Sequence, residues 1–358
     1  MTLAPLLLAA AALQAPAPAP PGLPPGTVAI VEMRIEAAMA RLGMPGLAVA
    51  VASREQLVWS ASYGQADVEN AVPVRTDTMF RLGSISKPIT ATAVLQLAER
   101  GKLDLDAPIQ RYVPTFPEKP WPVTPRLLLA HLAGIRHYKE GEFGSTRRYS
   151  AATEALHIFR DDALSHEPGT KFLYTTYGYN LLGCAVEGAS GQAFMDYVRA
   201  NVFEPAGMFT ARDDDVLALI PHRAQGYVKN AAGELRNSGL ADTSNKVPGG
   251  GMCATVEDVA RFAMALQGGV LLNRDSLVRM LSRQKTRDGK AVGYGLGFFL
   301  TEKDGIREAW HTGGQQRVSN VLYLQPDRRI AVVLLTNLEG IQPQITDLAR
   351  EIAAVVGR

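Results

Sequence analysis

Strand-like sequence occurs near both ends of this chain but not in the long stretch between them. Near the N-terminus, the apolar runs 47–53 (LAVAVAS) and 56–63 (QLVWSASY) are separated only by Arg54-Glu55, a spacing typical of an antiparallel hairpin. The C-terminal strand candidates are 293–300, 317–324 and 330–336. The pattern predicts an α+β fold, with one antiparallel sheet built from both ends of the chain and flanked by helices.

The region between the strand candidates has a different sequence pattern. Residues 102–289 read as helices broken by proline and glycine, so we expect a mostly helical inserted domain. The sheet part would then comprise 27–101 and 290–358, within one domain spanning 27–358. Apolar residues at helical spacing predict flanking helices over 28–42 and 343–356.

The first 26 residues have a composition of their own. Met1 to Ala15 (MTLAPLLLAAAALQA) has the length and apolar character of a signal peptide, and a Pro/Ala-rich linker, 16–26, follows it. We therefore expect an exported protein, either periplasmic or secreted. The run has no Lys or Arg before it, and the alternative is the N-terminal tail of a cytoplasmic protein. A stable membrane span is not expected, because spanning needs roughly 20 apolar residues.

Composition excludes some classes of protein. The 358 residues are 47% hydrophobic and 20% charged, which is typical of a folded globular chain. The net charge is only +2 and the basic residues are scattered, so nucleic acid is not an expected partner. Cys184 and Cys253 are far apart in apolar settings, which predicts buried free thiols and no disulfide framework.

A serine and a lysine lie three residues apart in the segment 80–90 (FRLGSISKPIT), at the start of a predicted helix that begins near Ser84 and continues through 91–100. Residues at this spacing are neighbours on a helix, so the amine of Lys87 could reach the hydroxyl of Ser84. A lysine can activate a serine only if burial or nearby cations keep it neutral. A helix N-terminus would also stabilise a developing oxyanion.

Spacing alone does not single out this pair. A second S-x-x-K match, Ser282 to Lys285, lies in a polar run that resembles a solvated surface. Tyr174 precedes a predicted helix and could line a cleft, or it could simply pack against the core. The run His311-Thr312-Gly313-Gly314 could let a substrate lie along a strand edge, or it could be an ordinary turn.

In combination, three segments resemble the active-site elements of the serine β-lactamase and penicillin-binding-protein superfamily. These are Ser84-Ile85-Ser86-Lys87, Tyr174-Thr175-Thr176 and His311-Thr312-Gly313. The His-Thr-Gly element is similar to that of the class C-like branch, which includes esterases and D-amino-acid-specific peptidases. Similarity extends to 101–106 (GKLDLD), 128–134 (LLAHLAG) and 248–251 (PGGG), and covers roughly Met33 to the C-terminus. Segments 134–138 (GIRHY) and 171–183 (KFLYTTYGYNLLG) resemble the mitochondrial serine β-lactamase-like protein and its bacterial relatives.

The resemblance implies a role for each matched residue. Ser84 would be the nucleophile, Lys87 its base, and Tyr174 the relay of protons to the leaving group. His311 stands where relatives often have lysine, and it would keep that corner electropositive or form hydrogen bonds through its imidazole. The backbone N–H groups of Ser84 and Gly314 would form the oxyanion hole, and the implied substrate contacts are Thr176, Thr312 and Gly313.

The implied activity is that of a serine hydrolase, which forms an acyl-enzyme with an amide or ester of a small molecule or peptide. No metal or cofactor is expected, and the six histidines include no H-E-x-x-H spacing. Thr176 replaces an asparagine and His311 a lysine found in many relatives, so a peptide or ester is expected in preference to an antibiotic. The alternative is a protein of this fold that binds ligands or forms assemblies without turnover.

Overall fold

The computed structural model describes residues 22–357, so the predicted signal peptide and residues 16–21 of the predicted linker lie outside the described residues. The first helix, α1 (Pro25–Leu42), begins within the predicted linker. Pro25 and Gly26 are therefore helical and not part of a linker. A proline in the first helical turn loses no hydrogen bond, because the N–H groups there have no partner within the helix.

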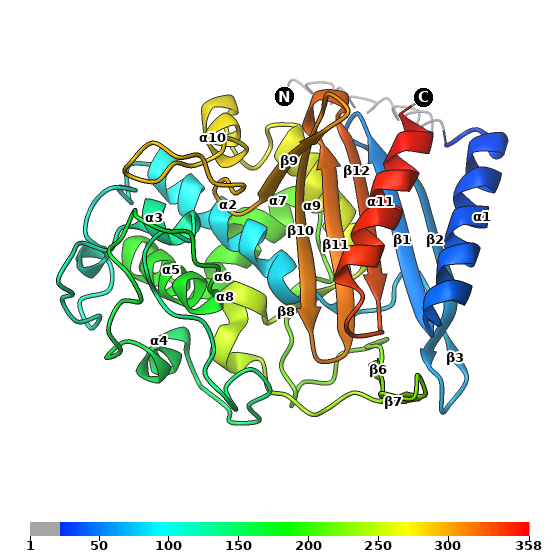
Figure 1. Cartoon of the computed structure of the whole chain (residues 1–358), viewed down its shortest axis with the longest axis horizontal. Helices are drawn as coiled ribbons and strands as arrows, with labels where there is room; N and C mark the ends of the chain where they lie inside the picture. The colour runs from blue at the N-terminus through cyan, green and yellow to red at the C-terminus, as the bar shows by residue number, and fades with distance from the viewer. Residues whose placement is uncertain (1–21, 358) are drawn as a thin grey trace, which may run out of the picture.

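The central sheet is antiparallel and combines both ends of the chain, as predicted (Figure 1). Its spatial order is β3-β2-β1-β12-β11-β10-β9. The strands are β1 (Gly46–Ser53), β2 (Gln56–Asp67), β3 (Val72–Pro73), β9 (Phe299–Lys303), β10 (Ile306–Gln315), β11 (Val318–Gln325) and β12 (Ile330–Thr336). Arg54 and Glu55, both at positive φ, form the tight turn between β1 and β2. Pairing of Leu47 with Thr336 aligns β1 with β12.

Helices cover both faces of this sheet (Figure 1). Leu47, Val49 and Val51 of β1 belong to the apolar cluster that includes α1 and α11 (Gln342–Val356). The intervening alanines face the other cluster, where α9 (Val256–Gln267) packs on β1 and β12. Small side chains on that face let the helix approach the sheet closely. The hydroxyl of Thr255 accepts a hydrogen bond from Asp258 N at 3.2 Å and caps α9.

The second part of the molecule surrounds α2 (Ser86–Glu99), which is buried on nearly all sides and packs against α5 and α8. Its helices are α3 (Pro125–Leu129), α4 (Ala152–Ala155), α5 (Thr176–Ser190), α6 (Phe194–Val198), α7 (Glu204–Ala206), α8 (Val247–Gly250) and α10 (Arg274–Met280). Short 3₁₀ turns are η1 (Gly83–Ile85), η2 (Ile109–Arg111), η3 (Leu156–Ile158), η5 (Ser244–Lys246) and η6 (Pro326–Arg328), and η4 (Arg199–Phe203) is π-helical.

This region also contains short strands that the prediction of a mostly helical insertion omitted. A three-stranded sheet has the order β4 (Phe80–Arg81), β8 (Met252–Ala254), β5 (Arg212–Asp213), and a hairpin pairs β6 (Tyr227–Lys229) with β7 (Leu235–Asn237). Strands of two or three residues are too short to show a period of two in the sequence.

The predicted strand at 293–300 is largely wrong, because β9 begins only at Phe299. Gly297 has a φ of 107°, and a Cβ there would lie 2.8 Å from Ala91 Cβ of α2. Gly297 therefore lets this segment pack against α2, and residues 293–298 do not extend the main sheet.

Two other expectations concern features outside the sheet. Cys184 and Cys253 are buried free thiols, as predicted. Within residues 22–357, no helix combines the length and the apolar character needed to cross a membrane.

Two glycines in helices allow a test of the packing around α5. A Cβ at Gly188 would lie 1.8 Å from the carbonyl oxygen of Tyr112, whereas a Cβ at Gly26 would meet nothing within 4 Å. We expect Gly188→Ala to lower the free energy of unfolding by about 1–3 kcal/mol, because the loop at Tyr112 must move. Gly26→Ala, the control, should not lower it. Equal stability of the two variants in urea denaturation would contradict this packing.

Candidate active site

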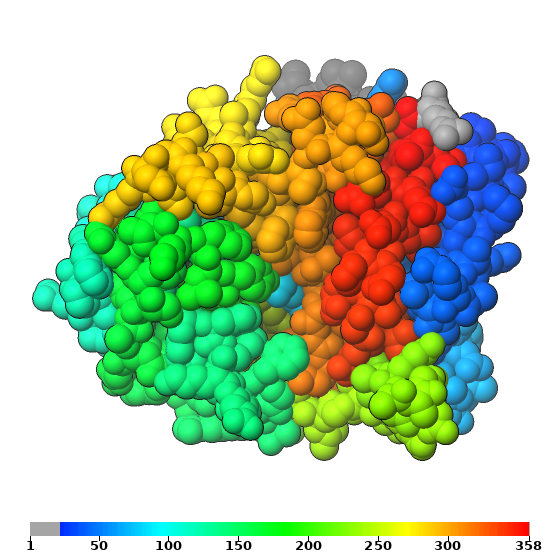
Figure 2. Space-filling view, viewed as in Figure 1, coloured from blue at the N-terminus to red at the C-terminus, as the bar shows by residue number. Residues whose placement is uncertain are grey.

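Ser84 lies in η1, the turn that enters α2, at the junction of the sheet and the helical part. Its side chain is partly exposed, whereas Lys87, in the first turn of α2, is completely buried. Ser84 Oγ and Lys87 Nζ are 2.9 Å apart, so the structure brings this predicted pair together. Figure 2 shows a hollow between the helical part and the β10–β11 strands, with atoms coloured like the start of α2 at its base.

Lys87 forms no hydrogen bond with a negatively charged side chain among the described residues. Its Nζ lies 2.7 Å from the carbonyl oxygen of Gly249 and 3.2 Å from Thr176 Oγ1, and none of its hydrogen-bond partners among the described residues is a carboxylate. Burial, together with the positive charge of Lys246, lowers the pKa of Lys87 well below its usual value. A neutral amine has two N–H donors and one lone pair. With the donors directed to Gly249 and Thr176, the lone pair can accept the Ser84 proton.

Thr176, a predicted substrate contact, lies beside Lys87. Its side chain is buried, and its hydroxyl contacts Lys87. We therefore assign Thr176 to holding the lysine in position.

Tyr174 immediately precedes the N-cap residue of α5, and its ring centroid is 4.8 Å from Lys87 Nζ. Burial raises the pKa of Tyr174, and a hydrogen bond with the Ser84 side chain partly offsets this effect. The phenol therefore stays protonated at neutral pH. It is a hydrogen-bond donor beside both Ser84 and Lys87, as its predicted role in proton transfer requires.

Strand β10 approaches Ser84 closely because glycine is present on both sides of the contact. Gly83 has a φ of 55°, and a Cβ there would lie 3.0 Å from Gly313 Cα. A Cβ at Gly313 would lie 1.9 Å from the carbonyl oxygen of Leu82. Because β9 pairs with β10 only as far as Trp310, the remaining edge of β10 is free to face η1. This edge carries the predicted oxyanion donor, Gly314 N–H, and the predicted substrate contacts Thr312 and Gly313.

His311 is buried on β10 and makes two hydrogen bonds. Its Nδ1 lies 2.8 Å from the carbonyl oxygen of Thr312, and its Nε2 lies 3.2 Å from the hydroxyl of Tyr294. Burial, with a contribution from Lys87, lowers the pKa of His311 to about 3. The neutral ring therefore donates through Nδ1–H and accepts at Nε2. Of the two roles implied for His311, the geometry matches the hydrogen-bonding imidazole and not the electropositive corner.

Several residues of the site had no role in the sequence analysis. His131 Nδ1 accepts a hydrogen bond from Thr175 N at 3.1 Å, and the His131 carbonyl accepts one from Leu173 N at 2.9 Å. These two bonds fix the backbone on both sides of Tyr174. His137 Nδ1 lies 3.4 Å from Thr176 N. The segments LLAHLAG and GIRHY, which contain these histidines, were the signal in the sequence that could have identified them.

Comparison with known proteins agrees with this arrangement. The family model described as Beta-lactamase matches residues 31–356, which is most of the chain. The chain belongs to the Beta-lactamase family. This confirms the resemblance inferred from the three motifs.

Curated relatives include the mitochondrial serine beta-lactamase-like protein LACTB. The human protein is 34% identical over 64% of this chain, and the mouse protein is 32% identical over 80% of it. The chain spans 54% of the length of the human relative and 70% of the length of the mouse relative.

Solved structures share the fold. The octameric penicillin-binding protein homologue from Pyrococcus abyssi has a TM-score of 0.79 at 25% identity, covering 92% of this chain and 78% of that one. The D-amino acid amidase from Ochrobactrum anthropi SV3 has a TM-score of 0.80 at 23% identity, covering 92% and 98%. The hydrolase EstCE1 has a TM-score of 0.78 at 22% identity, covering 93% and 98%. The α+β architecture is therefore that of this family.

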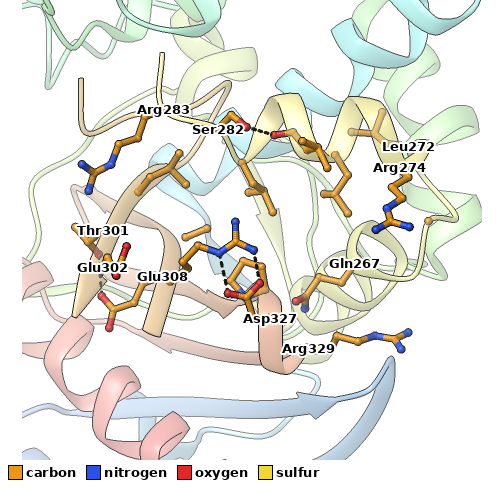
Figure 3. Close-up of a pocket in the computed structure, with 18 of the residues that line it drawn as sticks. Gln267, Leu272, Arg274, Ser282, Arg283, Thr301, Glu302, Glu308, Asp327 and Arg329 are labelled. Atoms are coloured by element: carbon orange, nitrogen blue, oxygen red, sulfur yellow. Dashed lines mark hydrogen bonds and ion pairs between the residues drawn. The ribbon is translucent and has the colours of Figure 1, made fainter. Parts of the chain in front are cut away.

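A large cavity of about 970 Å³ lies apart from these residues, between α10 and the β9–β10 hairpin (Figure 3). Ser282, from the second S-x-x-K match, is on its lining. Both Ser282 and Lys285 are exposed, and the Ser282 hydroxyl donates to Val278 O at 2.5 Å. This second match is a surface feature, because its lysine has none of the burial that makes Lys87 a base.

The depressed pKa of His311 predicts a loss of stability in acid. Between the unfolded pKa of about 6.5 and the folded pKa of about 3, the unfolded state binds more protons. The contribution of His311 to the free energy of unfolding is therefore fully present above about pH 6.5, and it falls as the pH drops toward 3. Between pH 7.5 and pH 5.0, the free energy of unfolding should fall by about 2 kcal/mol more in the wild type than in His311→Gln. Urea denaturation at the two pH values measures this difference. Equal losses in the two proteins would show that His311 is not held neutral.

Proposed function

We propose that this protein is a serine hydrolase that forms an acyl-enzyme on Ser84 with an amide or ester substrate. One observation carries the proposal: the partly exposed Ser84 Oγ lies 2.9 Å from a buried lysine that no carboxylate among the described residues pairs with. A buried amine of this kind is a proton acceptor near neutral pH, which a serine nucleophile needs. A protein that only binds ligands has no need of such an acceptor.

The reaction follows from the positions of these groups. As Ser84 Oγ attacks the carbonyl carbon, its proton passes to Lys87 Nζ. The N–H groups of Ser84 and Gly314 stabilise the oxyanion, and one such donor is typically worth about 3 kcal/mol in the transition state. The phenol of Tyr174 gives a proton to the leaving amine or alcohol and regains one from Lys87. Water then attacks the acyl carbon and gives a proton to Lys87 or Tyr174, and that proton passes to Ser84 Oγ as the acyl group leaves as a carboxylic acid.

The chemistry of the site favours a substrate that is neutral next to the scissile bond. Burial keeps His311 uncharged, so β10 has a neutral ring where a cation would be needed to attract a carboxylate. Structural neighbours described as a D-amino acid amidase and as a hydrolase with promiscuous acyltransferase activity support amide or ester chemistry on this fold. We therefore propose esters, amino acid amides or blocked peptides as substrates, and, from the composition of residues 1–15, an exported location.

The nucleophile can be tested with a matched pair of serine variants. We expect Ser84→Ala to lower kcat for p-nitrophenyl acetate at least about 1,000-fold, and Lys87→Ala to have a similar effect, because neither can form the acyl-enzyme. Ser282→Ala, in the exposed second S-x-x-K match, should keep wild-type activity.

Intact-mass spectrometry after brief exposure to a penicillin or an activated ester provides the direct measurement. An added acyl mass should occur in the wild type and in Ser282→Ala, but not in Ser84→Ala. Acylation or turnover that survives in Ser84→Ala would refute the assignment of the nucleophile.

Substrate charge gives a separate test. A D-amino-acid dipeptide and its C-terminal amide differ only by the carboxylate, and we expect the wild type to have at least about tenfold higher kcat/KM for the amide, because no cation balances the carboxylate. His311→Lys should narrow this ratio by improving the reaction of the free acid. A wild type that prefers the free acid would contradict a neutral subsite at His311.

A further inference from the structure

A second lysine is buried beside the Ser84–Lys87 pair. Lys246, at the end of η5, is only 1% exposed, and its Nζ donates a hydrogen bond to the carbonyl oxygen of Phe143 at 2.9 Å. The same Nζ lies 4.8 Å from the ring centroid of Phe143 and 5.4 Å from that of Tyr138. Among the described residues, no carboxylate pairs with it. A carbonyl and two ring faces stabilise an ammonium group, but they do not neutralise its charge.

Two short connections join Lys246 to Lys87. Along the backbone, Lys246 is three residues before Gly249, whose carbonyl accepts a hydrogen bond from Lys87 Nζ at 2.7 Å. Through side chains, the Tyr138 hydroxyl is hydrogen-bonded to Thr176, and Thr176 Oγ1 lies 3.2 Å from Lys87 Nζ. Two side chains, Tyr138 and Thr176, therefore link the two amines, in an interior that screens charge weakly.

Resting on the proposed hydrolase function, we propose that Lys246 is a positioning residue whose buried positive charge keeps Lys87 free of a proton and able to accept that of Ser84. We infer that two buried amines linked in this way, in a poorly screened interior, do not both hold protons, so the proton occupies the better stabilised one. Lys246 has two aromatic faces and a backbone carbonyl for its ammonium group. Burial and the charge of Arg81 lower the pKa of Lys246 to about 8, so it remains mostly charged at pH 7.

Other charged groups near Lys246 are already paired or neutral. Glu142 is held by Arg136 at 2.7 and 3.0 Å and by the hydroxyl of Tyr177. Arg81 is bound by the buried Asp214. Burial and the two lysines lower the pKa of His137 to about 4, so this ring is uncharged at neutral pH. The positive charge of Lys246 therefore acts on Lys87 without being cancelled.

The test compares Lys246→Met, which removes the charge but retains the length, with Lys246→Arg, which retains both. Protein containing lysine labelled with ¹³C at Cε is titrated by NMR, and the Lys87 signal is assigned by its loss in Lys87→Ala. In Lys246→Met, we expect the protonation midpoint of Lys87 to rise by at least about one pH unit. The midpoint of the acid limb of the pH profile of kcat/KM should shift to higher pH by a similar amount. Lys246→Arg should stay within about 0.3 units of the wild type on both measures.

An unchanged Lys87 midpoint in Lys246→Met would overturn the proposal even if activity falls, because a purely packing role predicts that result. Lys246→Gln provides a second neutral variant if Lys246→Met does not fold, and the same shift is expected. A wild type that hydrolyses no ester or amide would refute the proposed function. The NMR titration would still decide whether Lys246 controls Lys87, so the two failures are distinguishable.

Discussion

The structure depends on one unfavourable burial, that of the Lys87 amine in an apolar interior without a carboxylate. An ammonium group in this position would be strongly disfavoured, and the amine responds by giving up its proton. Gly249 and Thr176 satisfy the two remaining N–H donors and direct the lone pair toward Ser84. The same burial that costs folding free energy therefore creates the base that the proposed reaction needs.

This burial requires the two parts of the molecule to meet closely. Helix α2 carries Lys87 and is enclosed by α5 and α8, while β10 brings the edge of the main sheet against η1. Gly83 and Gly313 allow the two backbones to touch, because a side chain on either would collide with the other segment. The candidate site consequently has contributions from both parts, and neither part would form it alone.

The groups around Ser84 are mostly uncharged. Burial lowers the pKa values of His131, His137 and His311, and it raises that of Tyr174. A site of neutral donors and acceptors can shift protons over short distances without stabilising a permanent ion there. It also suits neutral esters and amides better than substrates with a carboxylate beside the reacting bond. Lys246, a buried cation that no carboxylate among the described residues pairs with, lies behind Tyr138 and Thr176, where it can influence Lys87.

The sequence by itself determined much of the architecture, because local patterns specify local structure. Alternating and continuous apolar runs predicted the β1–β2 hairpin and β12, and apolar residues at helical spacing predicted α1 and α11. The three motifs identified the family and pointed to Ser84, Lys87, Tyr174 and His311, but not to His131 or His137. The motifs already favoured Ser84 over Ser282, and the tertiary structure showed the physical difference between the two matches, because Lys87 is buried and Lys285 is exposed. It also decided the packing of 293–298 against α2, the neutral state of His311 and the position of Lys246. Each of these depends on contacts between segments far apart in the chain, and such contacts leave no periodic signal in the sequence.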